Sequence, residues 1–421
     1  MDEFLDRRRK KKNDGNNEEN GLTVIFTTRS TSKGNDTLAR LIANLQHSHP
    51  SSSSRIRFIS ENVDLTNLIS VRALSQRLVR RIPKLDAIIL NAGLGGWNGI
   101  DWVGAVWGVC TDLVHQVSWP TYKLAAVGEI TPRQIPWKKA KHQEQQQQEE
   151  EEPRLGSVFC ANVFGHYMLT HNLVSLLKRG GQGGGEGGGG RIIWISSLEA
   201  TTNLFDVDDI QGLRSKTPYE SSKALTDILA LTSNLPCTAP WVKSFYNNDN
   251  NDNNKPMHMY LAHPGICATS IVPLALPMFY SMLCIFTIAR LLGSPWHTIS
   301  TYLGAVAPVW LSLSDQQDLD RAELPYRENG GGGRAKWGSS SSLAYGEQPA
   351  STEVDGWGFG GVVGPAVVDE DRRRRRKRGA VDLSAVDRER FELLGRLCWQ
   401  RMEALRLMWD GLLDEAVPFE Q

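Results

Sequence analysis

The sequence has no clustered cysteines, no excess of either charge and no apolar leader, and each absence excludes a class of protein. Its six cysteines are widely spaced without a CxxC pair, and its histidines are not clustered, so we expect neither a disulfide framework nor a metal site. Lys and Arg together number 47, as do Asp and Glu, so no nucleic-acid partner is expected. No apolar run follows the basic residues Arg7 to Lys12, so we expect no signal peptide and a reducing compartment.

Low-complexity segments interrupt the chain, and they contain too little apolar surface to offset the entropy of ordering. The disordered regions that we expect are residues 1–21, insertions near 138–156, 180–190 and 246–256, and a loop at 328–380. The rest of 22–327 has the size of one α/β domain. Apolar residues at helical spacing within 381–421 predict a C-terminal amphipathic helix that packs on this domain. The basic run Arg372 to Arg378 has no interleaved aromatics, so we interpret it as a solvated loop.

Short apolar runs alternate with stretches of helical spacing along the domain. The predicted strands are 22–28, 56–59, 85–93 with its final turn, 191–195 and 257–262. Because these runs are apolar throughout, they indicate a parallel sheet covered on both faces, a doubly wound α/β fold. Ligands of such sheets bind beyond the carboxyl ends of the strands. Each polar or glycine residue found there has an ordinary explanation, such as a turn or a helix stop, but their occurrence after all five strands favours a site.

Tyr219 and Lys223 are four residues apart in a predicted helix, so they lie on one face of it. Such pairs also occur by chance on surface helices. A nearby ammonium group lowers the pKa of a phenol from its usual value of about 10, which would make Tyr219 a general acid. Ser196 and Ser197 end the preceding strand, where a hydroxyl would polarise a carbonyl group.

In combination, these motifs resemble the short-chain dehydrogenase/reductase family over roughly 22–269. The matching motifs are Asn91-Ala92-Gly93, Asn162 to Thr170, Ser197, Tyr219-x-x-x-Lys223, and Pro264-Gly265 followed by Thr269. The resemblance implies that Tyr219 protonates the nascent alkoxide, and that Lys223 lowers the pKa of Tyr219 and holds the nicotinamide ribose. It also implies that Ser197, with Ser196 as the fallback, polarises the substrate carbonyl, and that Asn162 supports a relay water. The implied cofactor-binding residues are Arg29, Asp64, Asn91, Tyr219, Lys223 and Thr269.

Within this family, the segment from Leu94 to Trp102 and the Thr27 to Ser30 strand end are similar to fungal 3-keto-steroid reductases. This similarity implies NADPH-dependent reduction of a sterol 3-ketone to the 3β-alcohol in the C-4 demethylation stage of ergosterol synthesis. Arg29 suits NADPH because a guanidinium group pairs with a ribose 2′-phosphate. The implied partners are the other C-4 demethylation enzymes and a membrane surface. The implied location is the endoplasmic reticulum membrane or a lipid droplet, with the catalytic domain facing the cytosol.

The stretch 271–313 is largely apolar, but Pro273 and Pro277 interrupt any helix long enough to span a membrane. For a lipid-soluble ketone, we expect a helical lid over the substrate whose apolar face rests in the membrane interface. An ordinary buried helix pair is the alternative.

The glycine-rich turn of this family, Thr-Gly-x-x-x-Gly-x-Gly, does not occur in the sequence. We therefore expect a Rossmann-like fold that lacks its first strand, which would lie between the strands predicted at 22–28 and 85–93. Either the true start codon lies upstream, or the protein is a non-catalytic relative. The retained Asn162, Ser197, Tyr219 and Lys223 favour the first explanation. The alternative functions are a non-catalytic scaffold of the sterol complex and a reductase of another apolar ketone.

Overall fold

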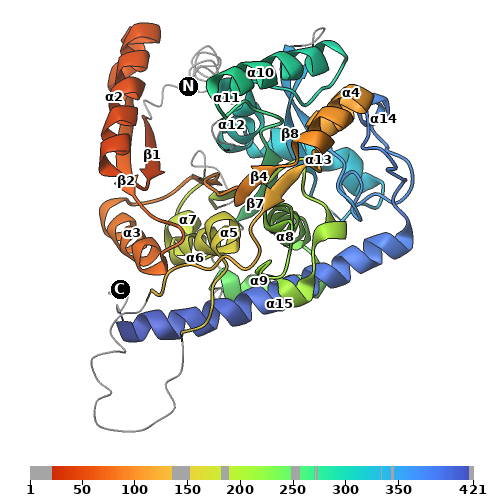
Figure 1. The fold of residues 1–421 in the computed structure, drawn as a ribbon. Helices are drawn as coiled ribbons and strands as arrows, with labels where there is room; N and C mark the ends of the chain where they lie inside the picture. The colour runs from red at the N-terminus through yellow and green to blue at the C-terminus, as the bar shows by residue number, and fades with distance from the viewer. Residues whose placement is uncertain are drawn as a thin grey trace.

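A central sheet of five strands organises the molecule (Figure 1). The computed structural model describes residues 21–134, 152–181, 189–247, 257–269, 271, 274–332, 334–342 and 346–416, so residues 1–20 and most of the three predicted insertions lie outside the described residues. The strand order is β3-β6-β7-β8-β9, in which β9 alone is antiparallel to its neighbour. The strands are β3 Ala87–Leu90, β6 Arg191–Ile195, β7 His258–His263, β8 Lys336–Ser342 and β9 Gly346–Thr352. The predicted α/β fold with a mostly parallel sheet is confirmed.

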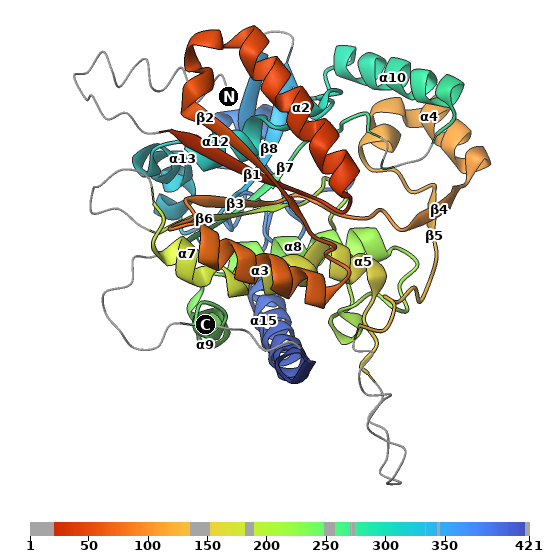
Figure 2. The ribbon, with the colours of Figure 1, turned by 90° about the vertical axis from the view of Figure 1, so that its left-hand side faces the viewer.

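The first two strands form a separate parallel pair. β1 Leu22–Thr28 runs beside β2 Ile56–Asn62, from Leu22 opposite Ile56 to Thr28 opposite Asn62. Figure 1 shows this pair and its helix α2 at the left side of the molecule, and Figure 2 shows them facing the viewer. Among the described residues, no strand joins this pair to β3, so the two sheets are separate at the position where the sequence predicts a missing strand.

Helices cover both faces of the five-stranded sheet. The helices are α2 Thr31–Ser48, α3 Leu68–Arg81, α4 Trp102–Ser118, α5 Ser157–Phe159, α6 Gly165–Asn172, α7 Val174–Lys178, α8 Pro218–Thr232, α9 Ala239–Phe245, α10 Leu276–Leu291, α11 Thr301–Gly304, α12 Val306–Leu313, α13 Gln316–Glu328, α14 Asp369–Arg373 and α15 Ala385–Ala416. Ile192 and Trp194 of β6 pack in the core that includes α3, α6, α8 and α15. Ile193 and Ile195 pack in the core that includes α12 and α13. Both faces of β6 are therefore buried, which explains its uninterrupted apolar sequence.

The prediction of a disordered loop at 328–380 is wrong. β8 and β9 lie within this segment and extend the domain beyond residue 327. Its serines are compatible with a buried strand because their hydroxyl groups are bonded: Ser339 donates to the Gly304 carbonyl at 2.7 Å, and Ser341 donates to the His297 carbonyl at 3.2 Å. The basic run is not a solvated loop either. Arg374 pairs with Asp371 at 2.8 Å, and Arg376 pairs with Glu353 at 2.9 Å.

The stretch expected to be a lid divides into an exposed part and a buried part. α12 packs against the sheet, with Ala307 and Leu311 fully buried, so the alternative of a core helix holds for this part. α10 instead packs on α4 and buries only Ala289. Within the part of the chain that the structure describes, no helix has the length and apolar character needed to cross a membrane.

Candidate active site

Tyr219 and Ser197 meet at the carboxyl end of β6. Tyr219 is the second residue of α8, which begins at Pro218, a residue suited to the first turn because it has no N–H to satisfy. Ser197 is the second residue beyond the end of β6, and its hydroxyl is near enough to the Tyr219 phenol to lower the pKa of that phenol. Because α8 is buried along its whole length, Tyr219 is fixed against the strand end. The structure thus brings together the two residues expected to contact the substrate carbonyl.

Lys223 lies one turn further along α8, with its Nζ atom 5.8 Å from the centre of the Tyr219 ring. This Nζ donates a hydrogen bond to the Ile195 carbonyl at 2.8 Å. Burial lowers the pKa of Lys223 to about 8, against an opposing effect of Asp227.

The pKa of Tyr219 is raised. Burial of the phenol is the main cause, the nearby Glu199 carboxylate adds to it, and the nearby Ser197 hydroxyl opposes it. The expected effect of Lys223 on this pKa stays a prediction. The phenol therefore stays protonated, which is the form that a general acid requires.

Asn162 lies in a π-helical turn, η3 Cys160–Phe164, a distortion that often marks functional sites. Its side-chain amide donates to the Leu94 carbonyl at 2.9 Å, and its carbonyl accepts from the Leu94 N–H at 2.7 Å. It also donates to the Ser222 hydroxyl at 2.9 Å, and Ser222 donates to the Tyr219 carbonyl at 2.7 Å. Asn162 therefore connects the loop after β3 to the start of α8, and its role with a relay water stays a prediction.

Sequence reasoning missed the residues that cover Tyr219. They come from an antiparallel pair, β4 Trp97–Ile100 and β5 Lys123–Ala125. The Trp97 ring centre lies 4.8 Å from that of Tyr219, and the Lys123 Nζ atom lies 3.9 Å from the Trp97 ring centre. Lys123 forms an ion pair with Glu199, whose pKa burial raises to about 7. Trp97 belongs to the segment Leu94 to Trp102 that the sequence singles out, but its position over Tyr219 and that of Lys123 depend on the pairing of β4 with β5.

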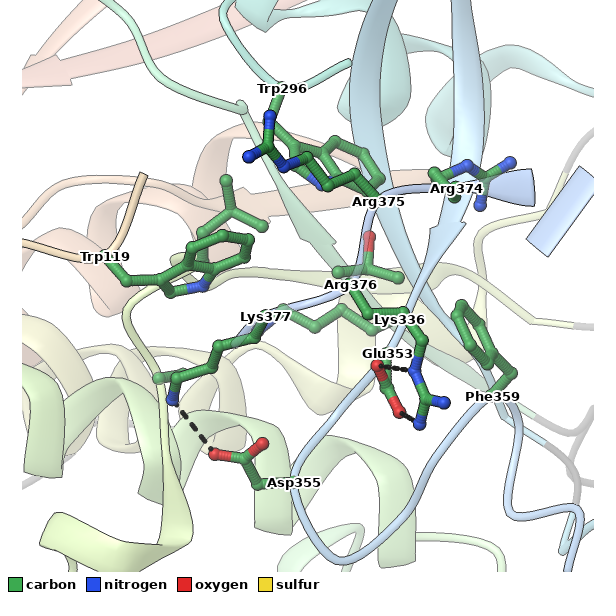
Figure 3. Close-up of a pocket in the computed structure, with 13 residues that line it drawn as sticks. Trp119, Trp296, Lys336, Glu353, Asp355, Phe359, Arg374, Arg375, Arg376 and Lys377 are labelled. Atoms are coloured by element: carbon green, nitrogen blue, oxygen red, sulfur yellow. Dashed lines mark hydrogen bonds and ion pairs between the residues drawn. The ribbon is translucent and has the colours of Figure 1, made fainter. Parts of the chain in front are cut away.

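A pocket adjoins the site (Figure 3). Leu198 and Ala200, which follow Ser197, form part of its lining. The remaining lining residues are the aromatic Trp119, Trp296 and Phe359, the charged Lys336, Glu353, Asp355, Arg374, Arg375, Arg376 and Lys377, and Thr352. The pocket therefore begins one residue beyond Ser197.

The residues expected to bind the cofactor follow four different strands. Arg29 is exposed after β1, and Asn91 is exposed after β3. Asp64 follows β2 and accepts hydrogen bonds from the Thr66 N–H at 2.9 Å and hydroxyl at 2.7 Å. Thr269, after β7, accepts from the Ile271 N–H at 3.4 Å. No contact joins these four residues to one another within the described chain, and their roles stay predictions.

The described residues fit only one end of a nicotinamide dinucleotide. Tyr219 and Lys223 offer a hydroxyl and an ammonium group for the nicotinamide ribose. A pyrophosphate needs free N–H groups at a helix N-terminus. At α2 and α3, however, the capping side chains of Ser30 and Asn67 accept N–H groups of the first turn at 3.5 and 3.0 Å. The glycine-rich segment 91–96 follows β3, but it leads into β4 and not into a helix, so it presents no helix N-terminus to a pyrophosphate.

The chain is similar to several curated fungal enzymes. It is 62% identical to a 3-keto-steroid reductase of Aspergillus fumigatus over 409 residues, covering 94% of this chain and 88% of that protein. It is 35% identical to a 3-keto-steroid reductase of Gibberella zeae, covering 98% of this chain and 90% of that protein.

Other comparisons are more distant. No protein-family model matches the chain. Among solved structures, a 7α-hydroxysteroid dehydrogenase complexed with NADH and 7-oxo glycochenodeoxycholic acid is 15% identical, with a TM-score of 0.37 over 69% of this chain and 77% of that one. An NADPH-bound carbonyl reductase from chicken fatty liver is 16% identical, with a TM-score of 0.32 over 61% of this chain and 73% of that one. On its identity to the two fungal relatives, the chain belongs to the 3-keto-steroid reductase family.

Proposed function

We propose that this chain reduces the 3-ketone of a sterol to the 3β-alcohol with NADPH, in the C-4 demethylation stage of ergosterol biosynthesis. The observation that carries this proposal is the placement of the Ser197 hydroxyl near Tyr219 just beyond the end of β6, with Lys223 on the next turn of α8. The 62% identity to a fungal 3-keto-steroid reductase supports the substrate class.

The chemistry follows from the two hydroxyl groups. A substrate carbonyl oxygen that accepts hydrogen bonds from Ser197 and Tyr219 becomes polarised, which favours addition at its carbon. NADPH, when bound, supplies the hydride. As charge develops on the carbonyl oxygen, Tyr219 donates its phenolic proton to that oxygen and completes the alcohol. The Lys223 ammonium lies close enough to stabilise the phenolate that remains.

We assign Arg29, exposed at the end of β1, to the 2′-phosphate of NADPH, since a guanidinium group pairs with phosphate oxygens.

The proposed location is the endoplasmic reticulum membrane or a lipid droplet, with the catalytic domain facing the cytosol beside the other C-4 demethylation enzymes. What supports this proposal is the exposed apolar face of α4 and α10. These helices pack through Val114, Val117 and Ala289 and leave large apolar residues uncovered. The most exposed of these are Val103, Trp107, Leu276, Tyr280 and Leu291, each between 62% and 82% exposed. A membrane interface accommodates such a face.

Turnover by Tyr219→Phe tests the proposed function. The variant keeps the ring and loses only the proton, so NADPH-dependent formation of the 3β-alcohol from a 4-methyl-3-keto sterol should fall at least about 10³-fold. Tyr280→Phe, on the exposed face of α10, is the matched control and should keep the wild-type rate. Retained turnover by Tyr219→Phe would overturn the assignment of Tyr219. A wild-type chain that neither turns over nor binds NADPH would instead favour the non-catalytic scaffold, and turnover only of an unrelated apolar ketone would favour a different substrate.

A further inference from the structure

A buried ion pair lies directly behind the candidate catalytic residues. Lys336, the first residue of β8, places its Nζ atom 2.6 Å from a carboxylate oxygen of Asp227 on α8. The two side chains are only 2% and 3% exposed. Burying two charges costs several kcal/mol per ion before their attraction is counted, so an apolar pair would serve stability as well. Stability alone therefore does not account for charged groups at these two positions.

The ion pair contacts the backbone of Ser197. The same Lys336 Nζ atom donates a hydrogen bond to the Ser197 carbonyl at 2.7 Å. Ser197 is the second residue beyond the end of β6, and its carbonyl also accepts a backbone hydrogen bond from the Ala200 N–H at 3.4 Å. Lys336 thereby fixes the backbone from which the Ser197 hydroxyl projects toward Tyr219.

The ion pair also faces Lys223. Asp227 is four residues beyond Lys223 on α8, so the two lie on the same face of the helix. The Asp227 carboxylate favours the charged form of Lys223, and the Lys336 ammonium opposes it. Other polar groups near this cluster include Ser196 after β6, Tyr219 on α8, His166 on α6 and His263 on β7.

We propose that Asp227 and Lys336 are positioning residues for the reduction, in which Lys336 holds the Ser197 backbone and the ion pair sets the charge around the Lys223 ammonium. The catalytic part of this proposal, the positioning of Ser197 and Lys223 for the reduction, rests on the proposed function. The effect of the ion pair on the charge of Lys223 needs neither substrate nor cofactor, so it is measurable in the protein alone.

The two partners carry opposite charges, so their removal acts on Lys223 in opposite directions. Lys336→Met removes a cation and leaves the Asp227 carboxylate beside Lys223, which should raise the pKa of Lys223 by about one unit. Asp227→Asn removes the anion and leaves the Lys336 ammonium, which should lower that pKa by about one unit. The double variant removes both charges and should give a pKa between those of the two single variants. A pair that does not set the charge around Lys223 predicts no such reversal of sign.

The test follows the lysine ¹³Cε resonances of the full chain by NMR as the pH is raised, with Lys223→Met used to assign the Lys223 signal. Shifts of opposite sign in the two single variants support the proposal. Equal titration of Lys223 in wild type and both variants, or shifts of the same sign, would overturn it. If one single variant unfolds because a buried charge is left unpaired, the pKa of Lys223 in the double variant is compared with that in the other single variant. The sign of this difference then tests the proposal.

A kinetic measurement separates this inference from the proposed function. In an active preparation, Lys336→Met should lower kcat by up to about 10²-fold with little change in KM, because the Ser197 hydroxyl loses its fixed position. Lys336→Arg keeps a cation at this position and should recover part of that loss. An unchanged kcat in Lys336→Met would overturn the positioning role. Absence of turnover in every form, together with opposite NMR shifts, would count against the proposed function while leaving the charge effect intact.

Discussion

Glu403 of α15 accepts a hydrogen bond at 2.6 Å from the hydroxyl of Tyr167 in α6, although the two residues are 236 positions apart. The same carboxylate accepts from the Ser244 hydroxyl at 2.5 Å and from Arg406 at 2.7 Å. Glu403 is 2% exposed, and its partners Tyr167 and Arg406 are buried as well. The network connects the C-terminal helix to α6 and α9.

We expect Glu403→Ala to destabilise the protein by about 3 to 5 kcal/mol, because it leaves the Arg406 guanidinium buried without its main partner. Urea denaturation followed by circular dichroism measures the change. Glu389→Ala, at an exposed position on the same helix, should change the free energy of unfolding by less than about 0.5 kcal/mol. Similar values for the two variants would show that the network contributes little.

We expect Ser197→Ala to lower kcat by about 10² to 10³-fold, since it removes one of the two donors to the carbonyl oxygen. Ser196→Ala is the matched control on the adjacent residue. The Ser196 hydroxyl is buried and donates to the Lys223 carbonyl at 3.4 Å, so its loss should cost less than about 10-fold. If the two effects are reversed in single-turnover measurements, Ser196 is the polarising residue.

The stability of the protein should fall as the pH decreases from about 6.5 to 4. Burial lowers the pKa of both His166 and His297 to about 4, whereas an unfolded histidine has a pKa of about 6.5. The folded state therefore binds fewer protons than the unfolded state in this window, and each group contributes a loss of about 3 kcal/mol across it. Urea denaturation at pH 7 and pH 5 measures the difference in the free energy of unfolding between the two pH values. His297→Gln should make this difference smaller. A free energy of unfolding that is equal at both values would contradict this prediction.

The double substitution Val103→Ser with Trp107→Ser should weaken binding to phospholipid vesicles at least about 10-fold. These residues are 82% and 72% exposed on α4, and their apolar area would be buried in the interface. Co-sedimentation with phosphatidylcholine and phosphatidylinositol vesicles measures binding. Leu393→Ser, at a 54% exposed position on α15, is the control and should bind like the wild type. If the double variant binds vesicles as the wild type does, another surface carries the contact.

The sequence predicts the parallel strands and the Tyr219 and Lys223 helix because their signals are local. A run such as Arg191–Ile195 is apolar on both faces, and the spacing of Tyr219 from Lys223 is fixed by one helical turn. The strand Lys336–Ser342 gives no such signal, since its serines have low strand propensity and resemble a flexible linker. Its place in the sheet depends on hydrogen bonds to distant residues, which no local pattern contains.

The same distinction explains which site residues are missed. Ser197 follows a recognisable strand, whereas Trp97, Lys123 and Lys336 reach the site only through pairings between segments that are far apart in the chain. The pKa of Tyr219 is also not a local property. The direction of the pKa shift depends on how deeply the phenol is buried, and burial is known only once the fold is assembled.

The separation of β1 and β2 from the central sheet has a consequence for cooperativity. The strand hydrogen bonds of β1 are all made with β2, and α2 buries only Gly34 and Leu45. Residues 21–62 therefore depend little on the hydrogen bonds that hold β6 and β7 together. This unit should open on its own at a lower free energy than global unfolding, so that its backbone amides exchange with deuterium well before those of the five-stranded sheet.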